Sequence, residues 1–542
     1  MIRSTFAGFT TAHLGMSASQ RALDVTGQNI ANINTPGYTR QRLDIASLNT
    51  QRGDFYNTSS NIKVGFGVEM TRISQLRDPF LDSQYRSQIS KLGTTDAHAA
   101  GFEQLATIFD ESTMLGVRNA FISLSSSLNT LSKEAGNKEN DTAVRSNMQV
   151  LLNLFHDAAV RLQDIREDTQ RGFATTDIKD VNELLDNIAE LNKSIKTSQV
   201  LGNPALELQD QRNSLLDELG SYLPITVKYK DKPIGPNQTV EILDVSFTDT
   251  TGQKHTLISD GYSGQFYTDV SGEPVTLSFS DANGTTRQLA GMVRNPDTGN
   301  VEYVEVLGSG TLKGTLDLLN KSGDFDQTDF KGIGYYEKAL DALVNQFALT
   351  FNEANKSVEK DADGNIIDPD NLIDRDLFTT SDNSGKFTAM NIKIADDWLN
   401  GTYGITITNN VVKDEDGSTG ETGSTANEVI MNMIKLLDST SHEFRGGDNN
   451  TKFYSGTFHD CFATLENTLG IDTKSANTLL DNQISVLNQT SNSRDGVSGV
   501  QLDEEGMNLL HYNQSYNAAA RLMTTLDEAL DKLINGTGVV GR

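Results

Sequence analysis

Both ends of the chain carry apolar residues at intervals of seven, and this repeat limits most strongly how the chain can fold. Near the amino terminus the repeat consists of Ile2, Phe9, Met16, Leu23 and Ile30. Near the carboxyl terminus it consists of Leu502, Leu509, Tyr516, Met523 and Leu530, with a companion row of Tyr512, Ala519, Leu526 and Leu533. Such a repeat is typical of helices that pair in a coiled coil.

Each repeat predicts a helix of about 30 residues, roughly 45 Å long, which needs a partner to be stable. The companion row of the first repeat is made of small residues such as Ala12 and Ser19, which let another helix approach closely. We therefore expect the two terminal helices to pair antiparallel. The pair would leave some apolar residues exposed and available to further copies of the chain, namely Phe6, Leu14, Val25, Leu510, Leu522 and Ile534.

The interior alternates between helical and β patterns. Apolar stripes at helical spacing run through residues 80–223, and Pro224 ends them. Residues 225–310 are rich in Thr, Val, Tyr and turn pairs, which indicates an inserted β domain. Helix is expected again at 335–356 and from 426 to the end, except for polar loops at 441–456 and 492–500. Short strands such as 403–410 are expected in between.

These patterns predict an α+β multidomain protein with paired N- and C-terminal coiled-coil helices, a long helical trunk and outer, mainly-β inserted domains. A chain of 542 residues is too long for one ordinary core. The predicted domains are residues 1–60 with 498–542 for the terminal coiled coil, 61–224 with 311–356 and 426–497 for the trunk, 225–310 for the β insert, and 357–425 for a second small β-containing insert.

Composition argues against several kinds of partner. The chain has 45 basic and 73 acidic residues and a net charge of −28, which repels nucleic acid and anionic lipid. The chain contains no run of about 18 apolar residues, which a membrane-spanning helix would need. The amino terminus also lacks the apolar core of a cleaved signal peptide. The single cysteine, Cys461, cannot form a disulfide within the chain. We expect no nucleic-acid and no membrane partner.

Two segments resemble metal sites only in part. Residues 361–371 ("DADGNIIDPDN") place oxygen ligands as a calcium loop does, but Ile366 and Leu372 stand where an EF-hand needs glycine and glutamate. "HEFRG" contains His442 and Glu443, but Gly446 replaces the second histidine of a zinc-protease helix. A solvated turn and an ordinary polar segment are the better interpretations.

Three further segments fail as catalytic motifs. The turn around Ser263 has Gln265 where a nucleophile elbow needs glycine. Residues 308–315 ("GSGTLKGT") lack the Gly-Lys-Ser/Thr ending of a phosphate-binding loop, so a hinge suffices there. Cys461 and His459 would share one face of a strand, but no further part of a thiol enzyme is identifiable. We expect no catalytic residue, no metal and no cofactor.

The stretch Ala22 to Arg42, "ALDVTGQNIANINTPGYTRQR", resembles the amino-terminal motif of bacterial flagellar rod, hook and hook-associated proteins. The stretch Ser498 to Ile534 is similar to the closing helix of the same group, and its "SGVQLDEE" entry resembles the hook-associated protein 1 family. Residues 205–227 and 456–470 are similar to interior segments of that family. The resemblance assigns a family turn motif to Asn32, Asn34, Thr35, Pro36, Gly37, Tyr38 and Arg40.

The resemblance implies a structural component of the bacterial flagellum that forms the junction between hook and filament and is needed for filament assembly and motility. It implies export through the flagellar type III apparatus without a cleaved signal peptide, and an extracellular place in a helical ring of the protein's own copies. Hook protein would lie below, hook-associated protein 3 above, and a cytoplasmic export chaperone would bind the C-terminal region beforehand. No enzyme activity is implied.

The turn motif also has a direct physical meaning. Proline disfavours helical geometry at Thr35, and Gly37 readily takes the positive φ of a tight turn, so the first helix should stop here. The segment that follows is expected to be extended, and its side chains Tyr38, Arg40 and Arg42 are expected to contact neighbouring subunits.

Two alternatives stay open at this stage. A flagellar hook or distal rod subunit would share the amino-terminal turn, although the long trunk helices and the "SGVQLDEE" entry favour hook-associated protein 1. An axial protein with an embedded hydrolase is the other alternative, and Gly446 argues against a protease of the HExxH kind.

Overall fold

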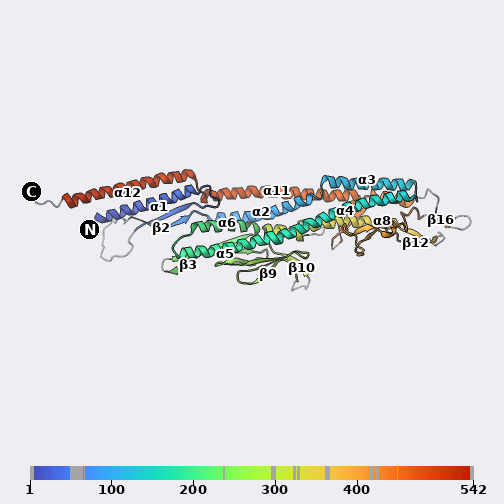
Figure 1. Ribbon diagram of the computed structural model, residues 1–542, viewed down its shortest axis with the longest axis horizontal. Helices are drawn as coiled ribbons and strands as arrows, with labels where there is room; N and C mark the ends of the chain where they lie inside the picture. The colour runs from blue at the N-terminus through green and yellow to red at the C-terminus, as the bar shows by residue number, and fades with distance from the viewer. Residues whose placement is uncertain are drawn as a thin grey trace, which may run out of the picture.

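The computed structural model is an elongated molecule with both chain ends at the same end of its long axis (Figure 1). It describes residues 5–48, 65, 67–235, 238–294, 301–321, 325, 330–360, 366–409, 411–413, 419–421, 427–447 and 450–536. Ile2 and residues 361–365 of the suspected calcium loop lie outside these ranges. Long helices run along the molecule, and sheets project from one side and from the far end. This arrangement confirms the predicted α+β fold class.

The terminal part contains two helices and a β-hairpin. They are α1 (Thr5–Ala31), α12 (Leu502–Gly536), β1 (Gln41–Ser47) and β2 (Val68–Gln75). The two strands pair antiparallel, with Gln41 opposite Gln75. Because β2 lies beyond the limit predicted at residue 60, that limit cuts through the hairpin and has to move to the end of β2.

The trunk is built from nine helices of the described chain. They are α2 (Pro79–Ala106), α3 (Glu111–Lys133), α4 (Lys138–Gly172), α5 (Ile178–Val200), α6 (Leu206–Tyr222), α7 (Thr311–Asn320), α8 (Ile333–Ala354), α10 (Glu428–Leu437) and α11 (Phe458–Ser498). A π-helical turn, Phe173–Asp177, joins α4 to α5. The predicted stripe of α4 is buried from Val144 to Leu162. Its phenylalanine, Phe155, packs against Phe121 and Phe347 with ring centroids 6.4 Å apart in both pairs.

The first inserted domain consists of two antiparallel four-stranded sheets. One has the order β3–β4–β5–β6, from β3 (Ile225–Gly235), β4 (Gln238–Thr248), β5 (Lys254–Ser259) and β6 (Tyr262–Ser263). The other has the order β10–β9–β8–β7, from β7 (Gln265–Asp269), β8 (Thr276–Ser280), β9 (Thr286–Arg294) and β10 (Val301–Glu305). Phe279 of β8 contacts Phe247 of β4 between the two sheets and its strand neighbour Phe266 of β7 within its own sheet, with ring centroids 6.0 and 4.5 Å apart. The β domain expected at this place is therefore confirmed.

The second insert is small, and its described residues form three strand pairs. Its elements are β11 (Ser357–Lys360), β12 (Ile366–Ile373), β13 (Phe378–Thr380), β14 (Ile392–Ile394), α9 (Asp396–Leu399), β15 (Val411–Lys413) and β16 (Thr419–Glu421). Trp398 is fully buried and donates from Nε1 to Asp141 of α4, 3.0 Å away. The strand predicted at 403–410 is wrong for its described residues, 403–409, because the N–H of Thr406 donates to the Asn355 side chain instead of to a strand.

Three local predictions about the trunk are also wrong. Residues 441–456 contain a hairpin, β17 (His442–Gly446) with β18 (Thr451–Gly456), and α11 continues through 492–498. Phe444 explains the hairpin, because alternation buries it against Phe458 with ring centroids 5.6 Å apart. Residues 311–315, expected to belong to a hinge, begin α7.

Candidate functional site: the joint between the terminal helices and the trunk

Helices α1 and α12 pair antiparallel, as the heptads predict (Figure 1). Near the start of α1, Gly8 lies under Leu526, and a methyl group added at Gly8 would come 3.1 Å from Cδ1 of that leucine. Gly15 lies opposite Ala519, and at the other end of α1 the Asn29 amide reaches the Glu505 carboxylate at 3.3 Å. The small residues therefore allow the two backbones to lie close together.

The row that α1 buries is the small one. Its buried residues are Ala12, Ala18, Ser19, Ala22, Val25, Thr26 and Asn29, so Val25 is not exposed as expected. The large predicted row of Phe9, Met16, Leu23 and Ile30 is half-buried. On α12 the half-buried residues of the predicted seam are Tyr512, Tyr516, Ala519, Met523, Leu526 and Leu530. Leu502, Leu509 and Leu533 are 58%, 40% and 55% exposed and so lie outside the buried part of this pair.

The turn after α1 has the geometry that its sequence predicts. Thr35 donates its N–H to the Asn32 carbonyl at 2.9 Å, and Tyr38 donates to the Thr35 carbonyl at 3.2 Å. Gly37 has φ +76°, and a Cβ at this position would come 2.5 Å from the Ser214 hydroxyl of α6. The glycine thus lets the turn approach the trunk closely. Asn34, Thr35, Pro36 and Gly37 are exposed.

Asn29 is the centre of a hydrogen-bond network beneath this turn. Its side chain is 1% exposed, and its Oδ1 accepts from the Tyr38 hydroxyl and from the Gln41 N–H, both at 2.9 Å. Its Nδ2 donates to the Gln41 carbonyl at 2.9 Å and to Glu505. One amide thereby joins α1, β1 and α12. Asn29 was not among the predicted site residues, although a polar residue in a buried heptad row is the signal that singles it out.

Arg40 joins the extended segment to α12. Its guanidinium pairs with two carboxylates, with Nε 2.7 Å from Glu505 and Nη1 2.5 Å from Glu504. Its backbone N–H donates to the Ser498 carbonyl at 2.9 Å. Burial alone would lower the pKa of Arg40, but the hydrogen bonds and charges of the two glutamates outweigh it and raise the pKa. The guanidinium is thus engaged inside the chain, and a contact of Arg40 with a neighbouring subunit stays a prediction.

Tyr38 stays a hydrogen-bond donor at all ordinary pH values. Burial, followed by the nearby carboxylates of Asp210, Glu207 and Glu505, raises the pKa of Tyr38 to about 12. Its hydroxyl donates to Asn29, so it too is engaged within the chain.

Asp210 of α6 fastens this segment to the trunk. Its two oxygens accept from the Thr39 N–H at 3.2 Å and from the Gln75 side chain at 3.0 Å. Burial raises the pKa of this carboxyl above its ordinary value. Arg77 adds a hydrogen bond of 3.3 Å to the Thr39 hydroxyl. The segment before β1 and the end of β2 are therefore held on the same helix.

The start of α12 is also tied to the trunk through α11. Arg494 lies 2.6 Å from Asp217, which also accepts from Arg86 at 2.8 Å. The Arg494 guanidinium stacks 3.8 Å above the ring of Tyr85. Together with the Asn29 network these contacts form what we call the joint: the residues that hold the terminal helix pair on α2, α6 and α11.

A cavity of about 500 Å³ lies between the turn and the trunk. Its lining includes Pro36, Gly37 and Tyr38 on one side and Leu191 and Leu215 on the other. The family turn thus borders a hollow beside its close approach to α6 at Gly37.

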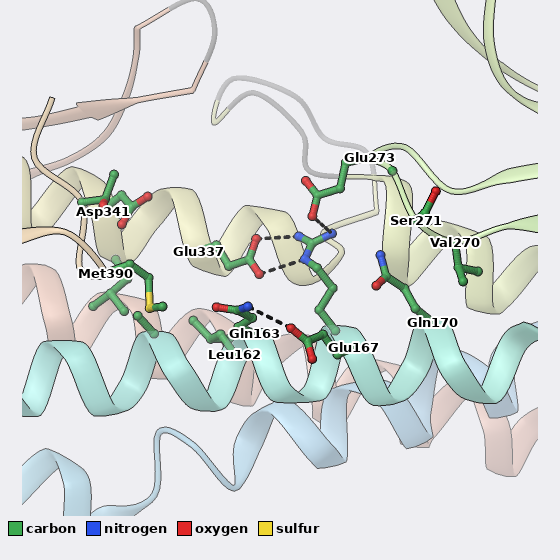
Figure 2. Close-up of a pocket in the computed structure, with 15 residues that line it drawn as sticks. Leu162, Gln163, Glu167, Gln170, Val270, Ser271, Glu273, Glu337, Asp341 and Met390 are labelled. Carbon is green, nitrogen blue, oxygen red and sulfur yellow. Dashed lines mark hydrogen bonds and ion pairs between the residues drawn. The ribbon is translucent and has the colours of Figure 1, made fainter. Parts of the chain in front are cut away.

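A second cavity, of about 400 Å³, lies where α4, α8 and the loop between β7 and β8 meet (Figure 2). Arg166 extends between two glutamates, with its Nη2 2.5 Å from the Glu337 carboxylate and its Nη1 3.1 Å from the Glu273 carboxylate. Its Nε also donates to Glu337 at 2.9 Å, and its Nη1 donates to the Leu319 carbonyl at 3.1 Å. Every nitrogen of this guanidinium is therefore engaged, and the group ties the β domain to the trunk.

The residues of the suspected chemical motifs make structural contacts within the fold. His442 is in a strand and contacts the Leu436 carbonyl at 2.7 Å. Cys461 is buried in the first turns of α11, and burial raises the pKa of its thiol, whereas His459 accepts from Arg118 at 3.1 Å. The Ser263 hydroxyl donates to Asp186 at 2.6 Å. Within the described ranges, no three His, Cys, Asp or Glu side chains group to hold a metal ion.

Family models match three parts of the chain. One described as the helical domain of flagellar hook-associated protein FlgK matches residues 102–367. One described as flagella basal body rod protein matches 9–39, and one described as the C-terminal part of flagellar basal body rod FlgEFG protein matches 496–536. The last two ranges contain most of α1, the turn and α12.

Whole-length relatives decide the family. Flagellar hook-associated protein 1 of Bacillus subtilis is 30% identical over 99% of this chain and 100% of its own length. The chain belongs to the flagellar hook-associated protein 1 family. The protein of that name from Salmonella typhimurium is 27% identical, over 96% of this chain and 98% of its own.

A solved hook-associated protein has the same fold. The flagellar hook junction protein FlgK of Burkholderia pseudomallei matches with a TM-score of 0.52 at 13% identity, over 77% of this chain and all of that one. The predicted resemblance to hook-associated protein 1 is confirmed, and the family places the chain in the flagellum. In the part of the chain that the structure describes, no helix is long and apolar enough to cross a membrane.

Proposed function

We propose that this chain is a structural subunit of the junction between hook and filament, needed for filament assembly and for motility. Membership of the hook-associated protein 1 family over the whole chain is the observation that carries the proposal. The antiparallel pair of terminal helices at one end of the molecule supports it, because such a pair can pack side by side with copies of itself around an axis. The chain's role is then to join two structures, with no chemical step.

Copies of the chain itself are the first proposed partners, in a helical ring. On the described chain, α11 and α12 carry exposed large apolar side chains, which are Ile471, Leu479, Ile484, Val486, Val497, Leu502, Met507, Leu509, Leu510, Leu522, Leu533 and Ile534. Exposed apolar rows of this length are typical of surfaces that become buried on assembly. The predicted seam residues of both terminal helices, including those outside the buried pair, are proposed to take part in these contacts.

The remaining partners follow the family. We propose hook protein below the ring, hook-associated protein 3 above it, and a cytoplasmic export chaperone on the C-terminal region before export. The same exposed side chains of α12 suit a chaperone that shields them. Export without a cleaved signal peptide and an extracellular place at the hook end belong to this proposal.

Location tests the proposal. A strain in which Asn283 is replaced by cysteine can be labelled with gold from outside, because Asn283 is exposed in the turn between β8 and β9 and its backbone does not have the positive φ of the neighbouring Gly284. We expect label in a narrow band at the distal end of hooks. Label along the hook, along the rod or only in the medium would contradict the proposal and would favour the hook or rod alternative.

A further inference from the structure

The terminal part of the molecule, which comprises α1, β1, β2 and α12, is connected to the trunk by two short links. Residues 76–78 connect β2 to α2, and residues 499–501 connect α11 to α12. Both links are neither helix nor strand. The Arg40 backbone lies between them, because its carbonyl accepts from the Leu76 N–H and its N–H donates to the Ser498 carbonyl, both at 2.9 Å. The two links therefore lie close together, and short segments of this kind absorb the change of backbone angle in hinges.

The hydrophobic core of the trunk does not extend into the terminal part. Among the described residues, the buried core cluster begins at Ala99 in α2 and ends at Ala476 in α11. The buried apolar residues of the terminal part lie outside this cluster and are Ala12, Ala18, Ala22 and Val25. No shared apolar core of the described chain therefore fixes the terminal part on the trunk.

Hydrogen bonds hold the terminal part on the trunk instead. The Thr39 N–H donates to Asp210 at 3.2 Å. The Gln75 side chain donates to Asp210 at 3.0 Å and to the Leu206 carbonyl at 2.9 Å. Arg77, in the first link, donates to the Thr39 hydroxyl at 3.3 Å. Such bonds restrain a domain weakly wherever water can take the place of one partner.

Two cavities adjoin these hydrogen bonds. The cavity beside the turn after α1 has a volume of about 500 Å³, and Asp210 lines it. The other has a volume of about 730 Å³ and walls from β2, α2, α6, β3 and β4, and Gln75 and Arg77 line it. Water in the cavities can therefore reach the polar contact and replace its hydrogen bonds when the two parts move.

We propose that the terminal part turns on the trunk as one rigid unit, with its hinge at residues 76–78 and 499–501. Relative motion is expected between domains that lack a large apolar interface. The unit itself is held together, because Asn29 joins α1, β1 and α12 and Arg40 binds two glutamates of α12. In a ring of copies such a hinge lets the trunks tilt while the terminal helices stay packed, and this consequence alone rests on the proposed function.

Distances between pairs of spin labels on the purified full-length chain test the proposal. The labels are attached to introduced cysteines, because the native Cys461 is 1% exposed and does not react readily. One pair, Gln514→Cys with Ser194→Cys, spans the hinge. A second pair, Ser194→Cys with Ser475→Cys, lies within the trunk, and a third, His13→Cys with Gln514→Cys, lies within the terminal part. All four positions are exposed. We expect the distance distribution across the hinge to be at least about two-fold broader than the other two.

A substitution in the polar contact sharpens the test. Gln75→Ala removes the hydrogen bonds to Asp210 and to the Leu206 carbonyl, so it should broaden the distribution across the hinge further and leave the other two unchanged. Gln163→Ala is the matched control, because its side chain donates to Glu167 at 2.8 Å within α4. The control should change none of the three distributions.

The possible outcomes decide the proposal. A distribution across the hinge as narrow as the one within the trunk would overturn it. An equally broad distribution within the terminal part would overturn it too, since that part would then not move as a unit. Equal effects of Gln75→Ala and Gln163→Ala would show that the polar contact does not restrain the motion. None of these results bears on the proposed function, because the labels report on the free chain and the location of the chain on hooks decides that function.

Discussion

Replacing Asn29 by alanine should open the joint. The substitution leaves the Gln41 N–H and carbonyl, the Tyr38 hydroxyl and one contact of Glu505 without their shared partner. A buried polar group left unpaired costs about 1–3 kcal/mol. The substitution leaves the two backbone groups of Gln41 unpaired, although water in the space of the lost amide partly replaces their hydrogen bonds. The free energy of opening the terminal part should therefore fall by about 2–4 kcal/mol, which raises its opening equilibrium constant about 30-fold to 700-fold.

Native-state hydrogen exchange measures this opening directly. Amides of α1 and β1 should exchange faster in Asn29→Ala by that factor, while amides of α4 and α8 in the trunk core should not change. Asn32→Ala is the matched control, because Asn32 sits three residues on and its side chain makes two exposed local hydrogen bonds, to the Gln28 carbonyl at 2.9 Å and from the Thr35 hydroxyl at 3.2 Å. The control should change exchange by less than about 0.5 kcal/mol. Equal effects of the two substitutions, or unchanged exchange in Asn29→Ala, would refute the role of the network.

Three further substitutions have defined outcomes. Leu526→Asp places a carboxylate in the α1–α12 pair at a cost of about 2–3 kcal/mol, so fractionation should find the protein exported but missing from hooks, and normal filaments would count against the pair. Gly101→Ala puts a Cβ 2.3 Å from the Leu318 side chain, and this overpacking should lower the free energy of trunk unfolding in urea by about 1–3 kcal/mol. The control Gly172→Ala adds a Cβ in open space on a helix and should raise the free energy of unfolding by up to about 1 kcal/mol. Burial raises the pKa of Asp341 to about 6, so its carboxyl should make the wild type lose stability as the pH rises from about 4 to about 6. Asp341→Asn should make this slope shallower in thermal unfolding and add about 2–3 kcal/mol at pH 7, while Asp177, whose pKa burial also raises to about 6, keeps part of the slope. An unchanged slope would contradict the assignment.

The sequence predicted the pairing of the two terminal helices because each helix carries a repeat of apolar residues at intervals of seven. The heptads at both ends led to the antiparallel pair, and the change from helical to β composition at Pro224 located the first inserted domain. Proline and glycine of the turn predicted the end of α1, which the structure has at Ala31. The domain limits other than the one crossed by the hairpin, and the role of the seam in assembly, stay predictions.

The sequence did not reveal which row of a heptad faces the partner. Large residues such as Met16 are the more hydrophobic, so their row was predicted to face the partner helix. The row of small residues that includes Ala12 and Ser19 is buried instead, because small side chains let the two helices lie closer together. Nor does a single polar residue such as Glu505 show that it will be buried until its partner Arg40, far away in the chain, is located. The hairpin at 442–456 was missed because its large buried aromatic residue, Phe444, stands between the charged residues Glu443 and Arg445.

Electron microscopy of a strain lacking this gene tests the central claim most directly. If the chain forms the junction, the deletion strain should carry completed hooks without filaments and should release flagellin into the medium, and the wild-type gene should restore filaments. Hooks of the deletion strain that bear filaments of normal length would contradict the account.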